Sequence, residues 1–404
     1  MRVTYVVLSP TFGIHQGTAD LANLHVMPMG GGSPDLQARA TVLTIFGAPI
    51  DRYAPPVMVQ PLISMRGTGL QRTSFDLRSL WKVYQAIVKS GSDVVHFNGP
   101  HIWNPILLLL LKRAGIATVQ TIHDLDPHFG ASYGRLLYAW NDLVIHTAKH
   151  ILVYGSAFRT RLINRGISPD RITYMPLLHL FLSYENERRL ESTGGAQIRT
   201  VQQAGESQQP FALFFARIEA YKGVGVLVEA MRRIEETAVY VSSSPADRAG
   251  MRAIIAGKGD VRQFVTGTLP SNVEVRSRQI QDDEAIDLFS RCSVVVLPYL
   301  DATQSALIAA AYFFGKPVIV TRIGALPEYV VDGETGWVIE PGNPQALADC
   351  LQSALDNPKR LREMGEAGRA WYQAQRRVER NTLLDMYQRV TTTAVHPAYE
   401  ARSI

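Results

Sequence analysis

Short apolar runs rich in β-branched residues alternate along the chain with longer stretches of helical periodicity. The runs are continuously apolar, which is typical of strands buried on both faces of a parallel sheet. The pattern occurs twice, so we expect an α/β protein with two Rossmann-like, doubly wound domains. Strands are predicted at 2–8, 42–46, 93–97, 117–122, 150–154 and 171–175, and again at 211–216, 252–256, 272–276, 293–297, 317–321 and 336–339.

A polar stretch at 183–210, rich in Gln, Glu, Gly and Ser, separates the two halves. Because it lacks apolar periodicity, it predicts a linker or a surface excursion. Two such domains facing each other would leave a cleft that could hold two substrates on opposite walls. The predicted organisation is an N-terminal domain at 1–185, a linker at 186–210, a C-terminal domain at 211–374, and a last helix whose end, about 375–404, returns to the first domain.

The composition is that of a globular protein larger than one hydrophobic core: 404 residues, 46% hydrophobic and 19% charged. A net charge of +5 suits a phosphate-bearing ligand or an anionic membrane surface, and is too small to indicate nucleic acid. Two cysteines without metal-ligand spacing exclude a disulfide framework. The apolar block 104–115 predicts a buried helix, too short to span a bilayer. The first residues run straight into a strand, so we expect a cytoplasmic protein, either soluble or peripheral at the inner face of the membrane.

Two cations, Arg217 and Lys222, lie where the predicted strand 211–216 gives way to a predicted helix at 223–233. In open α/β sheets the ligand binds at the carboxyl ends of the strands, so this junction suits a diphosphate. The alternative is a solvated basic turn on an ordinary surface helix.

Two further segments of the second half could bind an anion. Gly257 and Gly259 follow the strand 252–256, where glycines would let a ligand approach the backbone closely, although a plain strand-to-turn connection is the alternative. Asp301 is predicted to cap a helix whose first-turn amides would form a phosphate site, unless the helix is purely structural. That first turn would hold Thr303, Gln304 and Ser305.

In the first half, His123 and Asp124 directly follow the strand 117–122 and are expected to point into the cleft. A satisfied structural histidine is the alternative. Gly13 lies near the first strand-to-helix junction, where a glycine turn would let a substrate lie against the backbone. A metal site formed by His123, Asp126 and His128 is poorly supported by their spacing, so no metal is predicted.

The segments ARIEAYKG, AGKG and LPYLDATQS, followed by GKPVIVTRIGALPEYV, resemble the C-terminal half of the family-4 retaining glycosyltransferases, which have the GT-B fold. The resemblance is dense over 211–352 and looser over 1–183. It implies transfer of a sugar, with retention and without a metal or prosthetic group, from a UDP- or GDP-linked donor to a glycan or lipid-linked acceptor in polysaccharide or cell-envelope biosynthesis. It also implies that Arg217 and Lys222 neutralise the donor diphosphate, that His123 lies beside the donor sugar, and that Gly13 adjoins the acceptor.

One departure from that family concerns two glutamates, separated by seven residues, that commonly contact the donor. Alignment on the Gly-Lys-Pro of 315–317 places them at Ala302 and Ala310. Asp301 could replace the first, and nothing obvious replaces the second. A second hypothesis is therefore a catalytically degenerate homologue that acts as a binding or scaffold subunit. A third is another chemistry on the same fold, such as an epimerase, for which no convincing set of acid and base groups is evident, or a phosphorylase.

Overall fold

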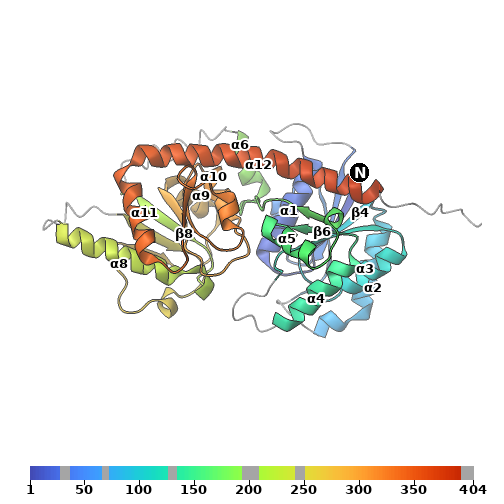
Figure 1. Ribbon diagram of the computed structural model, residues 1–404. Coiled ribbons are helices and arrows are strands. Elements are labelled where there is room, and N and C mark those ends of the chain that lie inside the picture. The colour runs from blue at the N-terminus through green and yellow to red at the C-terminus, as the bar shows by residue number, and fades with distance from the viewer. Residues whose placement is uncertain (28–36, 66–71, 126–133, 193–208, 242–250, 393–404) are drawn as a thin grey trace, which may run out of the picture. The chain divides into compact units, whose positions relative to one another are not determined.

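Two separate parallel sheets form the framework of the protein (Figure 1). The computed structural model describes residues 1–27, 37–65, 72–125, 134–192, 209–241 and 251–392. The first sheet has the order β3-β2-β1-β4-β5-β6-β7 and the second β10-β9-β8-β11-β12-β13, with parallel pairing between neighbours. The predicted fold class, an α/β protein with two Rossmann-like, doubly wound domains, is confirmed.

All the strands that the sequence predicts are present, with ends within three residues of the predicted ones. Strand β3 (Met58–Ile63) was not predicted, because it contains Pro61 and its first four positions alternate between exposed and partly buried. It is the edge strand of its sheet, where a proline costs no ladder hydrogen bond. The others are β1 (Arg2–Val6), β2 (Arg39–Ile45), β4 (Val94–Asn98), β5 (Ala117–Ile122), β6 (His150–Val153), β7 (Ile172–Tyr174), β8 (Phe211–Phe215), β9 (Arg252–Ala256), β10 (Val273–Arg276), β11 (Val294–Leu297), β12 (Val318–Thr321) and β13 (Gly336–Ile339).

The chain divides into two compact units, each built around one of the sheets. Of the described residues, unit 1 comprises those within 1–125, 134–175 and 378–392, and unit 2 comprises those within 176–377. Helix α12 (Pro358–Thr392) contributes its first part to unit 2 and its last part to unit 1.

Helices cover both faces of the unit 1 sheet. On one face, α2 (Leu77–Lys89), α3 (Asn104–Arg113), α4 (Gly134–Thr147) and α5 (Ser156–Asn164) bury their apolar sides in a common core with β2, β4 and β6. On the other face, α1 (Phe12–Val26) and the end of α12 meet around Tyr387, whose hydroxyl lies 2.6 Å from Nδ1 of His96 and donates to the hydroxyl of Tyr5. Helix α3 confirms the helix predicted there, but only one of its sides is buried.

Unit 2 has the same layered plan. Helices α8 (Val224–Val241) and α11 (Pro344–Asp356) pack on one face of its sheet, and α9 (Asp282–Arg291) and α10 (Leu307–Phe313) share a core on the other. Short 3-10 turns complete the connections: η1 (Ile50–Arg52), η2 (Arg72–Phe75), η3 (Pro169–Arg171), η4 (Ala220–Lys222), η6 (Val261–Phe264) and η7 (Leu326–Tyr329). Among the described residues, no helix is long and apolar enough to cross a membrane.

The first part of the predicted linker 183–210 is a helix, α6 (Tyr184–Ser192), which the sequence did not predict. Its one apolar anchor, Leu190, is buried. Its start is held by Asp282, whose carboxylate accepts from the backbone N–H of Ser183 at 2.8 Å. A single anchor gives no apolar periodicity, which is why the pattern did not indicate a helix. Residues 193–208 lie outside the described part of the chain.

Candidate functional site

Lys222 ends the short turn η4, which links β8 to α8 at the carboxyl end of the unit 2 sheet. Its ammonium nitrogen lies 3.8 Å from the ring centroid of Tyr299 and 4.8 Å from that of Tyr221. The negative faces of aromatic rings attract a cation, so the two tyrosines hold the ammonium in place. No ion pair joins Lys222 to a carboxylate in the described part of the chain, and burial lowers its pKa. The site thus holds a partly desolvated cation that an anion would stabilise.

Arg217 follows β8 two residues after the strand ends and carries the second positive charge. Its guanidinium forms an ion pair with Glu219, with 2.6 Å between Nη1 and Oε1. The side chain of Arg217 is 69% exposed, so the pair is screened by water and contributes little to stability. The guanidinium has five N–H donors, and one carboxylate contact leaves others that can bind a phosphate.

Backbone contacts fix the turn that carries Lys222. The carbonyl of Tyr221 accepts from the N–H groups of Leu300 at 2.8 Å and Asp301 at 3.3 Å. Gly223 has φ +67°, and a Cβ there would lie 1.9 Å from the carbonyl oxygen of Pro298. Only glycine allows this close approach, so the two strand-end loops after β8 and β11 lie against each other. The structure therefore places Asp301 beside the turn that carries Lys222.

Gly257 and Gly259 also allow a close approach of two backbone segments within the protein. A Cβ on Gly257 would lie 1.8 Å from the carbonyl oxygen of Ala216, and one on Gly259 would lie 2.6 Å from that of Ile218. The N–H of Ile218 donates to the carbonyl of Lys258 at 2.8 Å. These glycines let the segment around Arg217 pack against the turn after β9, and their approach to a ligand stays a prediction.

The loop 301–305 does not form the predicted capped helix. Helix α10 begins at Leu307, and Asp301 is not its cap. The hydroxyl of Ser305 accepts weakly from the N–H of Leu307 at 3.4 Å and lies 3.3 Å from the hydroxyl of Tyr299. The predicted helix start at Thr303, Gln304 and Ser305 is wrong, because tertiary contacts with the neighbouring loops hold this segment outside the helix. A role of these three residues in binding a phosphate stays a prediction.

Ala302 and Ala310 are buried, and both belong to the core that α10 shares with β11 and β12. Ala310 lies within α10 and is 1% exposed. In this chain the two positions that the resemblance assigns to carboxylates are packing positions. Burying a carboxylate there without a partner would cost several kcal/mol.

In unit 1, His123 follows β5 directly and is joined to the neighbouring strand and to α1 by side-chain hydrogen bonds. The hydroxyl of Thr18 donates to the carbonyl of Ile14 at 2.7 Å, so it accepts from the amide nitrogen of Asn98 at 2.9 Å. The amide oxygen of Asn98 then faces Nε2 of His123 at 2.7 Å. Nε2 must carry the proton, and burial lowers the pKa of His123, which keeps the ring neutral.

Gly13 is the second residue of α1 and does not lie in a turn before the helix, as the sequence suggested. A Cβ there would meet no atom of the described residues within 4 Å. Packing within unit 1 therefore does not require a glycine at this position, and the space over the first turn of α1 is open. Ile14, the next residue, belongs to the hydrogen-bonded chain that ends at His123.

Two of the three residues of the disfavoured metal site, Asp126 and His128, lie outside the described residues. In the part of the chain that the structure does describe, no group of three His, Cys, Asp or Glu side chains could hold a metal ion. Sequence reasoning missed Tyr221, Tyr299 and Glu219, which surround the two cations. Aromatic residues beside the Lys-Gly turn and after the apolar run 293–297 were the available signal.

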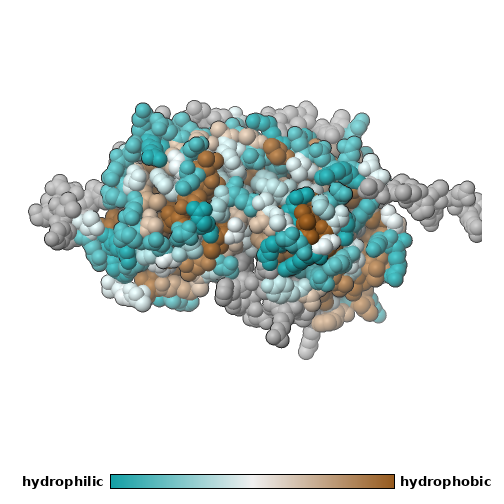
Figure 2. Space-filling model, in the orientation of Figure 1, coloured by the Kyte–Doolittle hydropathy of each residue, from teal (hydrophilic) through white to brown (hydrophobic). Residues whose placement is uncertain are grey.

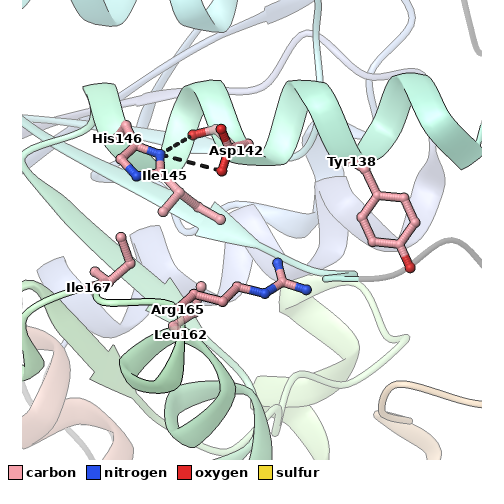
Figure 3. A pocket seen from close by; sticks show the side chains of 7 residues that line it. All are labelled: Tyr138, Asp142, Ile145, His146, Leu162, Arg165 and Ile167. Carbon is pink, nitrogen blue, oxygen red and sulfur yellow. Dashed lines mark hydrogen bonds and ion pairs between the residues drawn. The ribbon is translucent and has the colours of Figure 1, made fainter.

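A pocket of about 390 Å³ lies in unit 1 between α4 and the end of α5 (Figure 3). His146 lies at its rim with Nδ1 3.5 Å from the carboxylate of Asp142, and both side chains are largely exposed. Ile145, Leu162 and Ile167 form the apolar lining. The pocket lies where α4 and α5 end, near the amino ends of β6 and β7, which is the opposite end of the sheet from His123. An exposed ion pair at this end does not indicate a reaction centre.

Both halves of the chain match glycosyltransferase families. Residues 197–371 match the glycosyl transferases group 1 and residues 23–177 match the glycosyl transferase 4-like domain, which together cover most of the chain. Two Rossmann-like units with these matches define a glycosyltransferase of the GT-B fold, a hexosyl-type transferase.

Relatives and solved structures agree with this class. An uncharacterized glycosyltransferase of Methanocaldococcus jannaschii is 26% identical over 72% of this chain and 74% of its own length. A sulfoquinovosyl transferase of Arabidopsis thaliana is 22% identical over 74% of this chain and 57% of its own length. A D-inositol 3-phosphate glycosyltransferase of Corynebacterium diphtheriae is 28% identical over 38% of this chain and 36% of its own length. The chain thus spans little more than half the length of the Arabidopsis relative and about a third of the length of the Corynebacterium relative.

Among solved structures, HepE of Anabaena in complex with UDP superposes with a TM-score of 0.64 at 17% identity, covering 97% of this chain and 99% of that one. The sucrose-phosphate synthase of Thermosynechococcus elongatus gives 0.65 at 18% identity, covering 96% and 98%. At these identities the likeness shows the fold.

Proposed function

We propose that this protein transfers a sugar from a UDP- or GDP-linked donor to a glycan or lipid-linked acceptor, with retention of the anomeric configuration and without a metal. The observation that carries the proposal is the cation Lys222, held between two tyrosine rings at the carboxyl end of β8 with Arg217 beside it. The related structure solved with UDP supports a nucleotide donor.

In the donor half of the reaction, the bond from the anomeric carbon to the diphosphate breaks and negative charge develops on the departing phosphate. A cation already fixed in a partly desolvated place stabilises that charge without reorganising at the moment of reaction. Burial lowers the pKa of Lys222, and a bound diphosphate would raise it again by compensating the charge. Arg217 would form charge-assisted hydrogen bonds to the same group through donors that Glu219 does not use.

In the acceptor half, we propose that His123 faces the donor sugar and that the open space over Gly13 admits the acceptor. The hydrogen-bonded chain through Asn98 fixes the proton on Nε2 of His123 and leaves Nδ1 unprotonated. A neutral imidazole with a fixed tautomer can accept a hydrogen bond from a substrate hydroxyl through Nδ1. A lipid-linked acceptor would bring the protein to the inner face of the membrane as a peripheral partner.

The test of the proposal is the substitution Lys222→Ala. Loss of one transition-state charge contact should lower turnover at least about a hundredfold, measured as nucleoside diphosphate released from the preferred nucleotide-sugar. Lys359→Ala is the matched control, because Lys359 is an exposed lysine of unit 2 at the start of α12. Near-normal turnover in Lys222→Ala would refute the role of Lys222. Product anomers read by NMR test retention, and activity after treatment with a chelator tests metal independence.

Calorimetric titration with UDP and GDP separates the transferase from the scaffold hypothesis. We expect one of the two nucleotides to bind the wild-type protein and to bind Lys222→Ala more weakly. Absence of binding by any nucleoside diphosphate at millimolar concentration would support the degenerate homologue, since Ala302 and Ala310 replace both donor-contacting carboxylates.

A further inference from the structure

Helix α2 of unit 1 exposes a row of large apolar side chains. Leu77, Trp81, Tyr84 and Val88 follow the spacing i, i+4, i+7 and i+11, so they share one face of the helix. Leu77 is 72% exposed, Trp81 is 51% exposed, and Tyr84, which is partly buried, stacks near Trp81 with 5.0 Å between ring centroids. Phe75, just before the helix, is 69% exposed. We call these five residues the α2 stripe.

Except for Tyr84, the α2 stripe is separate from the face by which the helix packs. Leu80, Val83 and Ile87 are buried in the core of unit 1 and already anchor α2 to the sheet. Tyr84 packs partly against the same core, whereas Phe75, Leu77, Trp81 and Val88 are exposed and do not anchor the helix. Contiguous exposed apolar surface of this kind marks a site of interaction.

The neighbouring surface is apolar and basic as well. Helix α3 packs into the same core with one side and exposes Ile106 and Leu109 on the other. Figure 2 shows hydrophobic surface over the part of unit 1 where Figure 1 places α2 and α3.

Charge decides what could cover this surface. On α2, Arg78 and Lys89 lie on the face next to the α2 stripe, on the side away from the core. Lys82 shares this face, and its ammonium donates to the carbonyl of Leu62 at 3.0 Å. Residues 77–123 contain five basic residues, these three with Lys112 and Arg113, and one acidic residue, Asp93, which pairs with Arg2. The carboxylate of Asp76, just before α2, is occupied as the helix cap.

We infer that the α2 stripe docks on a membrane surface that contains anionic phospholipid. A helix with Trp and Leu on one face and Lys or Arg beside them is the pattern of an interfacial helix that lies in the headgroup region. Trp and Tyr suit this depth because their rings are apolar with one polar atom. The inference extends the proposed function, because a docked enzyme could reach a lipid-linked acceptor, and in this respect it rests on that proposal. The contacts that would hold the helix on the membrane do not involve the donor site.

Vesicle flotation of the full chain tests the inference. The wild-type protein should float with vesicles of 70% phosphatidylcholine and 30% phosphatidylglycerol, and binding should fall at least about tenfold in Leu77→Glu/Trp81→Glu. Leu269→Glu is the matched control, an exposed leucine of unit 2 exchanged for the same acid. Arg78→Gln/Lys89→Gln should weaken binding to these vesicles by about tenfold or more, because each basic side chain near an anionic surface contributes roughly fivefold.

The position of the helix is read independently by quenching. Brominated lipids should quench wild-type tryptophan fluorescence, and Trp81→Phe should lose that quenching while still floating. Lys222→Ala should float like the wild type, so failure of the donor site and failure of the docking surface are distinguishable. Flotation of Leu77→Glu/Trp81→Glu at the wild-type level, or no flotation of the wild type, would overturn the inference. Self-association in sedimentation that the same double substitution abolishes, without vesicle binding, would assign the surface to a second copy of the chain instead.

Discussion

The candidate residues of each unit follow the carboxyl end of a parallel strand, yet different forces hold them in the two units. In unit 2, Lys222 and Arg217 follow β8 and are positioned by backbone packing, with Gly223 and Gly257 against the carbonyls of Pro298 and Ala216. In unit 1, His123 follows β5 and is positioned by hydrogen bonds between side chains that come from three different elements. One site is charged and rigid through its main chain, and the other is neutral and depends on buried polar groups.

This difference decides what can be recognised in a sequence. A glycine that accepts no side chain and a lysine beside it form a short local motif, so the segments of unit 2 resemble a family. A chain of hydrogen bonds between Thr18, Asn98 and His123 joins residues far apart in sequence. No spacing reveals it, which is why the first half of the sequence resembles the family less closely.

Lowering the pH should produce the largest difference in stability between the two units. Seven of the eight histidines in the described part of the chain belong to unit 1, and burial lowers the pKa of His96 to about 3 and those of His101 and His150 to about 4. Below pH 6.5 these histidines become protonated in the unfolded chain, whereas in the folded protein they stay neutral until the pH is lower. Their contribution to the free energy of unfolding is fully present above pH 6.5 and is lost as the pH falls toward 4. At pH 5 the loss is about 2 kcal/mol for each histidine.

Hydrogen exchange at pH 7.5 and pH 5.0, corrected for intrinsic rates, should show protection falling in unit 1 before unit 2. His150→Asn should remove part of this pH dependence. His146→Asn should not, because His146 is largely exposed. Equal loss of protection in both units would contradict the assignment of acid sensitivity to the buried histidines.

Gly257→Ala tests the rigid side of the comparison. The new methyl would lie 1.8 Å from the carbonyl oxygen of Ala216 at a backbone φ of +150°, so the segment before Arg217 must move. We expect a loss of about 2–3 kcal/mol in the free energy of unfolding by urea, together with weaker binding of nucleoside diphosphate. Gly267→Ala, at φ +77° with open space around the Cβ, should cost only about 1 kcal/mol. Equal costs at the two positions would show that the contact with Ala216 is not rigid.

Local and tertiary determinants explain which parts of the fold the sequence predicted. The strands were recovered because continuous burial leaves a continuous apolar run, as in β4 and β5. The start of α10 was placed at Asp301 because the residues that follow it suit a helix N-terminus. The actual loop is set by the carbonyl of Tyr221 and by the N–H of Ala325, which donates to Thr303 at 3.0 Å.

The site was predicted in the same uneven way. The two cations were singled out by their position after a strand, whereas the packing contact of Gly257 was not predicted because its partner, Ala216, is 41 residues away in the sequence. The rings that hold Lys222 were not predicted, since Tyr299 approaches it from another strand end.

Asn98→Leu tests the neutral side of the comparison. The substitution keeps the approximate volume but leaves the Nε2 proton of His123 without its acceptor. An unsatisfied buried group should lower the stability of unit 1 by about 1–3 kcal/mol and let the imidazole change tautomer, which nitrogen NMR can read. Asn164→Leu, at an exposed position of α5, is the control. Affinity for UDP or GDP should be unchanged, and a large loss of it would show that the two sites are not independently held.

Gly13→Ala has the smallest expected effect on stability and the opposite sign. The new methyl meets no atom within 4 Å and replaces the residue with the higher conformational entropy inside a helix, so unit 1 should gain about 0.5 kcal/mol. If the open space over α1 admits the acceptor, the same methyl should lower turnover with the full acceptor and leave affinity for the nucleotide unchanged. A variant that is more stable and slower would show that Gly13 is kept for a ligand, in contrast to Gly257, which is kept for packing. A variant that is more stable and equally fast would remove Gly13 from the site.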